Sequence, residues 1–589
     1  MFINKEQVDG HKEEYFGESM KELVTFQVGS YANFIGSHFW NFQDELLGLV
    51  EDTEADLVFK NQNIDMDVLY RTGENHQGMA TYTPRLISVD FQGSLGSMSS
   101  HGTLYNQNSS LSSSVTTWTG SVSTQSTEPH KKNLFLKRLY DEGQEVGANA
   151  NGIDKVSGES NSEILDTDVV KSLEDGVQYW TDFSKVHYHP QSLFELNGSW
   201  MGTKEFNNYR IGRDTVSEGL QGDEINERLR FFVEECDHVQ GIQFIVDDSG
   251  GFSGVAASLL ENIEDEYTNV PVLLYSVRSP GSYTSVANRK QVISRNLHDA
   301  VSFSALSSLC KLIVPLGLPS LSESRASQFL NLQNEKLYHS SAVYASAIHS
   351  ITLPFRMKRV GPAESLSESG AMDLYEGIQM LVGQARQNSV TILDAAMPSP
   401  SITDRRFPLR NLQPLTPETA EDVEDLQAIE SMVVHGVRGA GNHEASVSEV
   451  REAVETSYEN TSTRPRFSHV SVSRCPLPIP LPFPSIFGNL VGRRGELLSN
   501  PQPGSGSRGS LDVHSIPMAA RLRSTTAVLP FLENRLNNIR KFGMERGSIG
   551  VDVLRDWGFG KEEIEEIGEN LSKMVLALDP EQGYSSDSD

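Results

Sequence analysis

A repeated succession of short apolar strands and amphipathic helices constrains this chain most strongly. Residues 22–28 have the pattern of a strand that ends at Gly29, and Ile35, Phe39 and Phe42 then recur at helical spacing. Strands that alternate with helices predict an α/β fold, with a mostly parallel sheet flanked by helices. Ligands of such sheets bind at the carboxyl ends of the strands, which is where the glycine turns of this chain fall.

The same succession continues along the chain and then changes character. Further strands are expected at 85–90, 242–246, 270–275 and 312–316, and helices at 229–236, 255–267 and 340–351. Beyond residue 355 we expect helices at 372–387, 417–434 and 518–543 and a strand at 390–394. The pattern therefore predicts a larger α/β unit followed by a second, smaller α+β domain.

Length and composition suggest how the chain is divided. A chain of 589 residues predicts more than one packed unit. The predicted segments are a flexible leader at 1–20, an N-terminal segment at 21–140 with a Ser-rich insertion at 94–127, a linker at 141–163, a core at 164–355, a C-terminal α+β domain with polar breaks at 356–575, and an acidic tail at 576–589. Alternating prolines at 476–484 predict an extended segment, either a strap across the body or a ligand for a partner.

Charge and cysteine content narrow the classes of function. The chain has 49 Lys and Arg against 79 Asp and Glu, a net charge of −30. This charge opposes binding to nucleic acid and docking to anionic lipid through a basic patch. The three cysteines lie far apart, which favours a reducing compartment. Because no secretory signal or long apolar run is present, we expect a cytoplasmic protein that reaches membranes only peripherally.

Two glycine turns between a strand and a helix could hold an anion. Backbone N–H groups at a helix N-terminus bind anions, and glycine lets a phosphate approach closely. The candidate binding residues are Gly29, Ser30, Asn33, Asp90, Gly250, Gly251 and Ser253. Neither turn continues into the Gly-Lys-Ser/Thr of a Walker loop.

The second glycine turn and the 187–189 segment also carry residue types that other chemistries use. Ser253 sits where a hydrolase nucleophile would lie, but the Gly-x-Ser-x-Gly pattern fails at Val255 and no partner His or Asp can be named. Asp247 and Asp248 could hold Mg²⁺ or simply cap the next helix. The 187–189 segment, His-Tyr-His, favours a structural role over a metal site. No catalytic residue and no metal ligand is therefore assigned.

The residues around both glycine turns resemble a known family. Residues 21–29 and 35–40 resemble the opening strand, phosphate loop and helix of tubulins, and residues 235–243 and 266–267 resemble the stretches on either side of the tubulin glycine-rich loop. Segments 82–85, 93–97, 132–133, 250–254 and 478–484 are similar to the Misato family, which resembles a tubulin joined to other segments. The resemblance implies a tubulin/FtsZ-like fold.

The resemblance also indicates a degenerate nucleotide site. Where tubulins carry a Gln, a Cys and an acidic residue, this chain has Ser30, Tyr31 and Gln92. The glycine-rich loop aligns with residues 249–255, where three glycines are lost and Phe252 replaces a threonine. We therefore expect weak or no GTP binding, no GTPase activity and no required cofactor, with Tyr31 and Phe252 as the side chains that could fill the site.

Two functions follow from the resemblance. The first is a non-enzymatic regulator of mitochondrial distribution, morphology and fusion, located in the cytoplasm and peripherally at the mitochondrial outer membrane. Its partners would be proteins of the mitochondrial surface or of the tubulin and microtubule system. The second is a GTP-binding, self-assembling cytoskeletal protein that acts with microtubules.

Overall fold

The computed structural model describes most of the chain. The described residues are 21–74, 80–99, 131–141, 165–198, 206–217, 219–284, 288–358, 369–383, 388–421, 423–439, 441, 443–459, 461, 464–504, 506–545 and 547–578. The predicted leader, most of the Ser-rich insertion, nearly all of the linker and the end of the acidic tail lie outside these residues.

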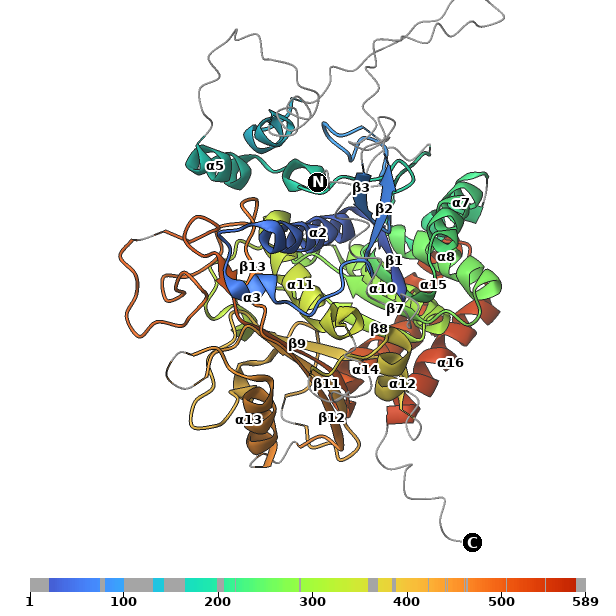
Figure 1. Ribbon diagram of the computed structural model, residues 1–589. Helices are drawn as coiled ribbons and strands as arrows, with labels where there is room; N and C mark the ends of the chain where they lie inside the picture. The colour runs from blue at the N-terminus through green and yellow to red at the C-terminus, as the bar shows by residue number, and fades with distance from the viewer. Residues whose placement is uncertain are drawn as a thin grey trace, which may run out of the picture.

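A six-stranded sheet forms the first part of the fold (Figure 1). Its strands, in the order β5–β4–β1–β6–β7–β8, are all parallel. Their bounds are β1 Glu22–Val28, β4 Leu86–Phe91, β5 Leu193–Leu196, β6 Val239–Asp247, β7 Val272–Val277 and β8 Leu312–Leu316. All seven residues of β1 are buried, as a central strand covered on both faces requires.

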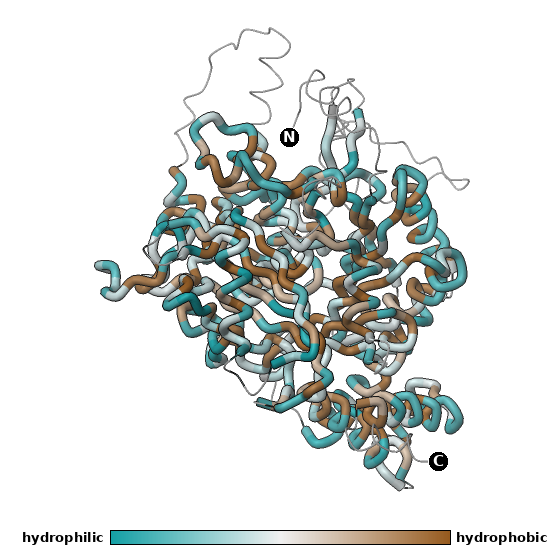
Figure 2. The backbone as a smooth tube through the Cα atoms, turned by 60° about the horizontal axis from the view of Figure 1, so that its bottom comes forward, coloured by the Kyte–Doolittle hydropathy of each residue, from teal (hydrophilic) through white to brown (hydrophobic). Residues whose placement is uncertain are grey.

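Helices cover both faces of this sheet. On one face lie α2 Ser30–Glu51 and α11 Leu337–Thr352, which pack against each other over one large core cluster. The other face carries α6 Tyr209–Ser217, α7 Gln221–Glu234, α8 Phe252–Glu266 and α10 Arg289–Leu309. Hydrophobic stretches concentrate in the interior and hydrophilic ones on the outer turns (Figure 2). The tubulin-like α/β fold expected from the sequence is confirmed.

Several short elements lie around the N-terminal half. They are α3 Leu57–Lys60, the antiparallel hairpin of β2 Tyr70–Glu74 and β3 Ala80–Pro84, α5 Asp166–Gly176, η1 Trp180–Phe183, α9 Gly281–Thr284, η2 Arg325–Ser327 and η3 Leu353–Arg356. The hairpin is held to the body by an ion pair between Arg71 and Glu235 and by the same arginine lying over the Phe231 ring.

A second, mixed sheet follows in the C-terminal half. Its order is β10–β9–β15–β11–β12, with bounds β9 Ile392–Ala396, β10 Gln413–Pro414, β11 Ile429–His435, β12 Phe467–Ser473 and β15 Met518–Ser524. Around it lie α12 Leu374–Val382, η4 Leu409–Asn411 and α13 Val447–Glu459. A parallel bridge between Ile313 and Val390 joins the edge of the first sheet to this region.

The last helices return to the first sheet. The segment contains η5 Thr526–Val528, α14 Leu529–Asn538, the π-helix η6 Ile539–Met544, α15 Ile549–Asp556 and α16 Lys561–Leu578. Their apolar residues belong to the same core cluster as α8 and α10. The C-terminal helices thus pack against the earlier helices α8 and α10. Figure 1 shows them in red beside the green of α8 and α10.

The proline-rich segment is a buried strap. It begins with β13 Leu477–Pro478, which pairs with β14 Ser515–Ile516, and Phe483 is 1 % exposed. The Tyr338 hydroxyl of α11 donates to the carbonyl of Pro482 at 2.8 Å. Because most of the segment is buried against α2 and α11, the strap interpretation fits it better than that of a free partner ligand.

Two of the helix predictions for the second unit, at 417–434 and 518–543, are wrong. Residues 417–434 form no helix among those described, and their end is strand β11. The expected helix at 518–543 begins instead as strand β15, the central strand between β9 and β11, and becomes helical only at Thr526. Tertiary pairing overrides the helical preference of Met518–Ser524. Within the described residues, no helix is both long and apolar enough to cross a membrane.

Candidate functional site

The Gly29 turn brings three candidate residues together. Gly29 has φ +102°, a conformation that side chains with a Cβ rarely adopt, and α2 starts directly after it. The Ser30 hydroxyl donates to Oδ1 of Asp90 at 2.7 Å, and Nδ2 of Asn33 donates to Oδ2 of the same carboxylate at 3.2 Å. The carboxyl ends of β1 and β4 are therefore joined by hydrogen bonds within the chain.

The carboxylate of Asp247 lies at the N-terminus of α2. The backbone N–H of Tyr31 donates to its Oδ2 at 3.3 Å. Its Oδ1 accepts from the backbone N–H and the hydroxyl of Ser249, at 3.1 and 2.6 Å. A helix N-terminus attracts anions through its free N–H groups and its dipole. Here the chain itself supplies the acceptor, a carboxyl oxygen of Asp247 at the end of β6.

Aromatic rings fill the space between the two glycine turns. A Cβ placed on Gly29 would lie 2.9 Å from the ring of Phe252, and one on Gly251 would lie 2.6 Å from the ring of Phe206. The rings of Phe91, Phe206 and Phe252 form a cluster with centroids 4.6 to 5.2 Å apart. Phe252 is 5 % exposed. A phosphate cannot approach the glycine backbone unless these rings move.

Tyr31 does not take part in filling this space. Its hydroxyl donates to that of Ser340 on α11 at 2.9 Å, and its ring meets Tyr344 edge-on. Burial raises the pKa of Tyr31 well above its ordinary value, so the phenol stays neutral. Of the two side chains expected to fill the site, Phe252 does so and Tyr31 joins α2 to α11.

The second glycine turn is closed by its own contacts. The Ser253 hydroxyl, fully buried, donates to the carbonyl of Gly250 at 2.9 Å. A Cβ on Gly250 would lie 2.6 Å from the carbonyl oxygen of Phe206. Among the described residues, Ser253 has no histidine or carboxylate in hydrogen-bond reach, so the hydrolase interpretation gains no support.

Two buried carboxylates make the site electronegative. Burial, with a smaller contribution from the nearby Asp247, raises the pKa of Asp90 to about 6, although hydrogen bonds from Ser30, Phe91 and Asn33 oppose this rise. Burial likewise raises the pKa of Asp247, with Asp248 adding to the effect. An incoming phosphate would meet these two acids without a neighbouring cation from the glycine turns.

Asp248 is held in a separate ion network. Nε of Arg278 donates to its Oδ1 at 2.8 Å, and the other side of the guanidinium pairs with Asp299 at 2.8 Å. The Ser276 hydroxyl also donates to Asp248, at 2.6 Å. Asp248 therefore links the end of β6 to β7 and, through Arg278, to α10. Sequence reasoning missed Arg278, although a charged residue directly after an apolar strand was a usable signal.

The segment at 187–189 lies in irregular chain, not on a strand. Burial lowers the pKa of His187 and of His189 to about 4, so both imidazoles are neutral at pH 7. The His189 ring stacks on Phe231 at 4.9 Å. In the part of the chain that the structure describes, no three His, Cys, Asp or Glu side chains gather as metal ligands would.

Comparison with known proteins agrees with this geometry. Residues 21–141 match the model of the Misato Segment II tubulin-like domain, and residues 170–357 match that of the tubulin domain. The chain is 27% identical to Protein misato homolog 1 of Bos taurus over 94% of its own length and 97% of that protein. It is 29% identical to the Danio rerio protein of the same name, over 86% and 89% of the two chains. The Mus musculus protein is 33% identical over 57% of this chain and 59% of its own length.

The parallel sheet, the two strand-to-helix glycine turns and the matched domains define a tubulin-like protein. More specifically, the chain resembles the Misato family: residues 21–141 match its Segment II domain, and the similarity to Protein misato homolog 1 extends over nearly the whole chain.

Proposed function

We propose that this chain is a non-enzymatic tubulin-like protein that regulates mitochondrial distribution and morphology, and with them fusion. It would act in the cytoplasm and peripherally at the mitochondrial outer membrane. Its partners would be proteins of the mitochondrial surface or of the tubulin and microtubule system. The observation that carries the non-enzymatic part is the Asp247 carboxylate, which accepts the Tyr31 N–H where a phosphate would bind. The mitochondrial part follows from the resemblance to the Misato family.

Steric and electrostatic effects both support a site without nucleotide. The Phe252 ring lies against Gly29, and Phe206 lies against Gly251. Asp90 and Asp247 add two carboxyl groups in a buried environment, where electrostatic interactions are stronger than in water. Without bound GTP there is no phosphoryl group to transfer, so the chain would act through its contacts with other proteins.

A nucleotide titration tests the absence of GTP binding. We expect fluorescent GTP to show no saturable binding to the purified full chain at micromolar concentrations, with or without Mg²⁺. Ser249→Asp is the matched variant, because Ser249 is exposed and the change replaces the hydroxyl that donates to Asp247 with a carboxylate that would repel phosphate. Micromolar binding by the wild type that weakens at least tenfold in Ser249→Asp would contradict a nucleotide-free site.

The mitochondrial role needs a test in cells. Depletion of the protein should change mitochondrial distribution and shape, and wild type and Ser249→Asp should restore both equally well. Cell fractionation should find the protein in the cytosol and on mitochondria, where protease added to intact organelles digests it. Normal mitochondria after depletion would refute the role. Rescue by the wild type but not by Ser249→Asp would indicate that the role depends on nucleotide binding.

The second candidate is a GTP-binding, self-assembling protein. It is favoured by the retained geometry around Gly29, where the positive φ, Asn33 and Asp90 keep the strand-turn-helix form. This candidate predicts that the chain sediments as polymer with GTP but not with GDP. If the chain sediments equally with GTP, with GDP and without nucleotide, the non-enzymatic function is the better account.

A further inference from the structure

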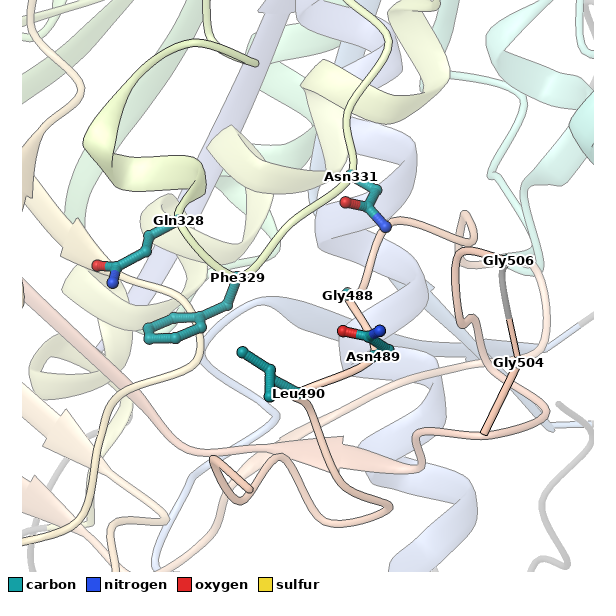
Figure 3. A pocket seen from close by; sticks show the side chains of 8 residues that line it. All are labelled: Gln328, Phe329, Asn331, Gly488, Asn489, Leu490, Gly504 and Gly506. Atoms are coloured by element: carbon teal, nitrogen blue, oxygen red, sulfur yellow. The ribbon is translucent and has the colours of Figure 1, made fainter. Parts of the chain in front are cut away.

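A surface hollow beside the proline strap does not discriminate between ligands. It lies between the chain after η2 and the chain after the strap, and Figure 3 shows Phe329, Asn331, Asn489 and Leu490 among its side chains. None of the residues that line it is charged or buried, so neither an ion pair nor desolvation selects a ligand there. The outer edge of the second sheet is more specific.

The second sheet ends in a strand that has a neighbour on one side only. β12 is the last strand in the order β10–β9–β15–β11–β12, and β11 runs parallel to it (Figure 1). The opposite edge is β10, which has two residues, whereas β12 has seven. A strand at the edge of a sheet presents main-chain N–H and C=O groups that can pair with another chain.

Main-chain hydrogen bonds show which residues of β12 point outward. The C=O of Ser473 accepts an N–H from the residue after β11 at 3.0 Å, so Ser473 points toward β11. The N–H of Val472 donates instead to the C=O of Ser369, outside the sheet, at 2.8 Å. Because both main-chain groups of a residue in a parallel strand lie on one side and successive residues alternate, Ser468 and Val470 also point outward.

Three of these outward groups have no partner within the described part of the chain. The C=O of Val470 accepts Nη2 of Arg451 at 3.2 Å. The N–H of Val470 and both main-chain groups of Ser468 make no hydrogen bond with any described residue. Two donors and one acceptor at the spacing of a β-strand are matched by the main chain of another extended segment.

The side chains at the start of β12 favour a segment that is acidic and partly apolar. Phe467, the first residue of the strand, is 51 % exposed, and Arg464 and Arg466 are exposed just before it. Neither arginine forms an ion pair with a residue that the structure describes. The carboxylates of Asp425 and Glu430, before and on the neighbouring β11, are buried and already hydrogen-bonded. The exposed charges that directly precede β12 are therefore positive.

We propose that the N-terminal half of β12 binds an extended, acidic segment of a protein partner as an added strand. The C=O groups of the segment accept the N–H groups of Ser468 and Val470, and one of its N–H groups donates to the C=O of Ser468. Its acidic side chains pair with Arg464 and Arg466, and an apolar side chain packs on Phe467. The main-chain bonds hold any extended segment, and the side chains select an acidic one.

The binding of such a segment does not depend on the glycine turns or on the mitochondrial role, so its failure would leave both as they are. It is tested with the peptide acetyl-Glu-Val-Thr-Val-Glu-amide and the purified full chain. We expect saturation-transfer NMR to detect binding with a Kd of about 1 mM, as suits a contact of three main-chain hydrogen bonds. Two altered peptides should bind about fivefold more weakly or worse. One carries N-methyl groups on its three central residues, which removes the N–H donors, and the other has lysine in place of both glutamates.

Two altered proteins place the binding on β12. Ser468→Pro removes one outward N–H where an edge strand tolerates proline, and the pair Arg464→Glu and Arg466→Glu reverses the charge, so each should weaken binding about fivefold or more. The pair Arg540→Glu and Lys541→Glu is the matched control, since both residues are exposed on η6, which packs against α10 and α16. Circular dichroism checks folding, and the Arg464 and Arg466 pair decides if the proline variant unfolds.

Four results would each overturn the proposal. They are equal binding by the wild type and the Arg464 and Arg466 pair, equal weakening by the control pair, equal binding of either altered peptide, and no binding of the acidic peptide at about 10 mM.

Discussion

Phe252 and Asp247 both contact Gly29, and together they decide what the site can hold. A Cβ on Gly29 would lie within 2.9 Å of each of them, so neither side chain leaves room at this turn. The ring excludes a ligand by its volume, and the carboxylate satisfies the helix N–H that a ligand would need. Removal of one alone would therefore not restore a phosphate site.

The ring of Phe252 is expected to contribute strongly to stability. Truncation to alanine would remove its contacts with Phe91 and Phe206 and leave a cavity. Phe252→Ala should lower the free energy of unfolding by about 3–5 kcal/mol, as measured by urea denaturation. Phe467→Ala is the control, because Phe467 is 51 % exposed and should cost less than about 1 kcal/mol. Similar losses for the two variants would show that the ring cluster does not support the site.

Asp90 should make stability fall as the pH rises. Burial raises its pKa from 3.8 in the unfolded chain to about 6 in the fold, so the folded state binds the proton more tightly. The favourable contribution is fully present below about pH 4 and is lost as the pH rises through 6. A shift of this size corresponds to about 3 kcal/mol. The variant Asp90→Asn has no titratable group at this position and therefore serves as the reference.

Urea unfolding at several pH values checks this expectation. Between pH 4 and pH 7, wild type should lose stability relative to Asp90→Asn by an amount of that order. Parallel pH profiles for the two proteins would mean that Asp90 titrates as it does in the unfolded chain.

Part of the residue-scale arrangement was predictable. Ser30 and Asn33 follow β1, and Asp90 lies near the end of the neighbouring β4, so their contact could be expected from the alternation of strands and helices alone. Phe206 could not be foreseen, because it enters the site from the irregular chain before α6 and no local pattern marks it. The role of Asp247 was open as well, since capping and metal binding use the same carboxylate.

At the scale of elements, strands buried on both faces were the easiest to predict. β7 and β8 are almost entirely apolar, and β1 and β6 carry apolar residues with a few buried polar ones between them. The predicted bounds of all four lie within a few residues of the observed ones. β15 was missed because its Ala, Arg, Leu and Met residues favour helices, and only pairing with β9 and β11 makes it a strand. β11 was missed for a different reason. Its apolar run follows an acidic stretch that looked helical.

Close packing of α6 against α8 depends on glycine. A Cβ on Gly212 would lie 1.6 Å from the carbonyl oxygen of Gly251, so alanine cannot fit without moving the second glycine turn. Gly212→Ala should destabilise the protein by about 2–4 kcal/mol, measured as a loss in urea midpoint. Gly48→Ala in α2 is the matched control, because nothing lies within 4 Å of its Cβ position. It should stabilise the protein by about 0.5–1 kcal/mol, and a loss in both variants would argue against a specific contact.

At the scale of the whole molecule, one carboxylate joins three distant parts of the chain. Glu174 of α5 accepts the Ser485 N–H of the strap at 2.6 Å, Nε2 of His339 on α11 at 2.9 Å, and Nζ of Lys336 at 3.3 Å. Burial would raise its pKa, but the hydrogen bonds from His339 and Ser485 and the charges of His339 and Lys336 outweigh it and lower the pKa to about 2.

This connection should weaken in acid. Because the folded pKa of Glu174 lies below its ordinary value of 4.5, its contribution is present above about pH 4.5 and is lost as the pH falls toward 2. Glu174→Gln should remove this part of the acid sensitivity. Hydrogen exchange at Ser485 should become faster in wild type between pH 5 and pH 3, after correction for intrinsic rates, and should already be fast in the variant. Equal protection of Ser485 in both proteins at pH 5 would contradict the connection.

The Asp247 carboxylate at the start of α2 bears on how many chemical states the protein has. A protein that holds GTP exists in two chemical forms, before and after hydrolysis, and the exchange between them sets its timing. Under the proposed nucleotide-free function, in which Asp247 accepts the helix N–H in place of a phosphate, the chain has a single chemical form throughout its lifetime. We therefore expect its activity in the cell to follow its abundance and the supply of its partners, with no internal clock.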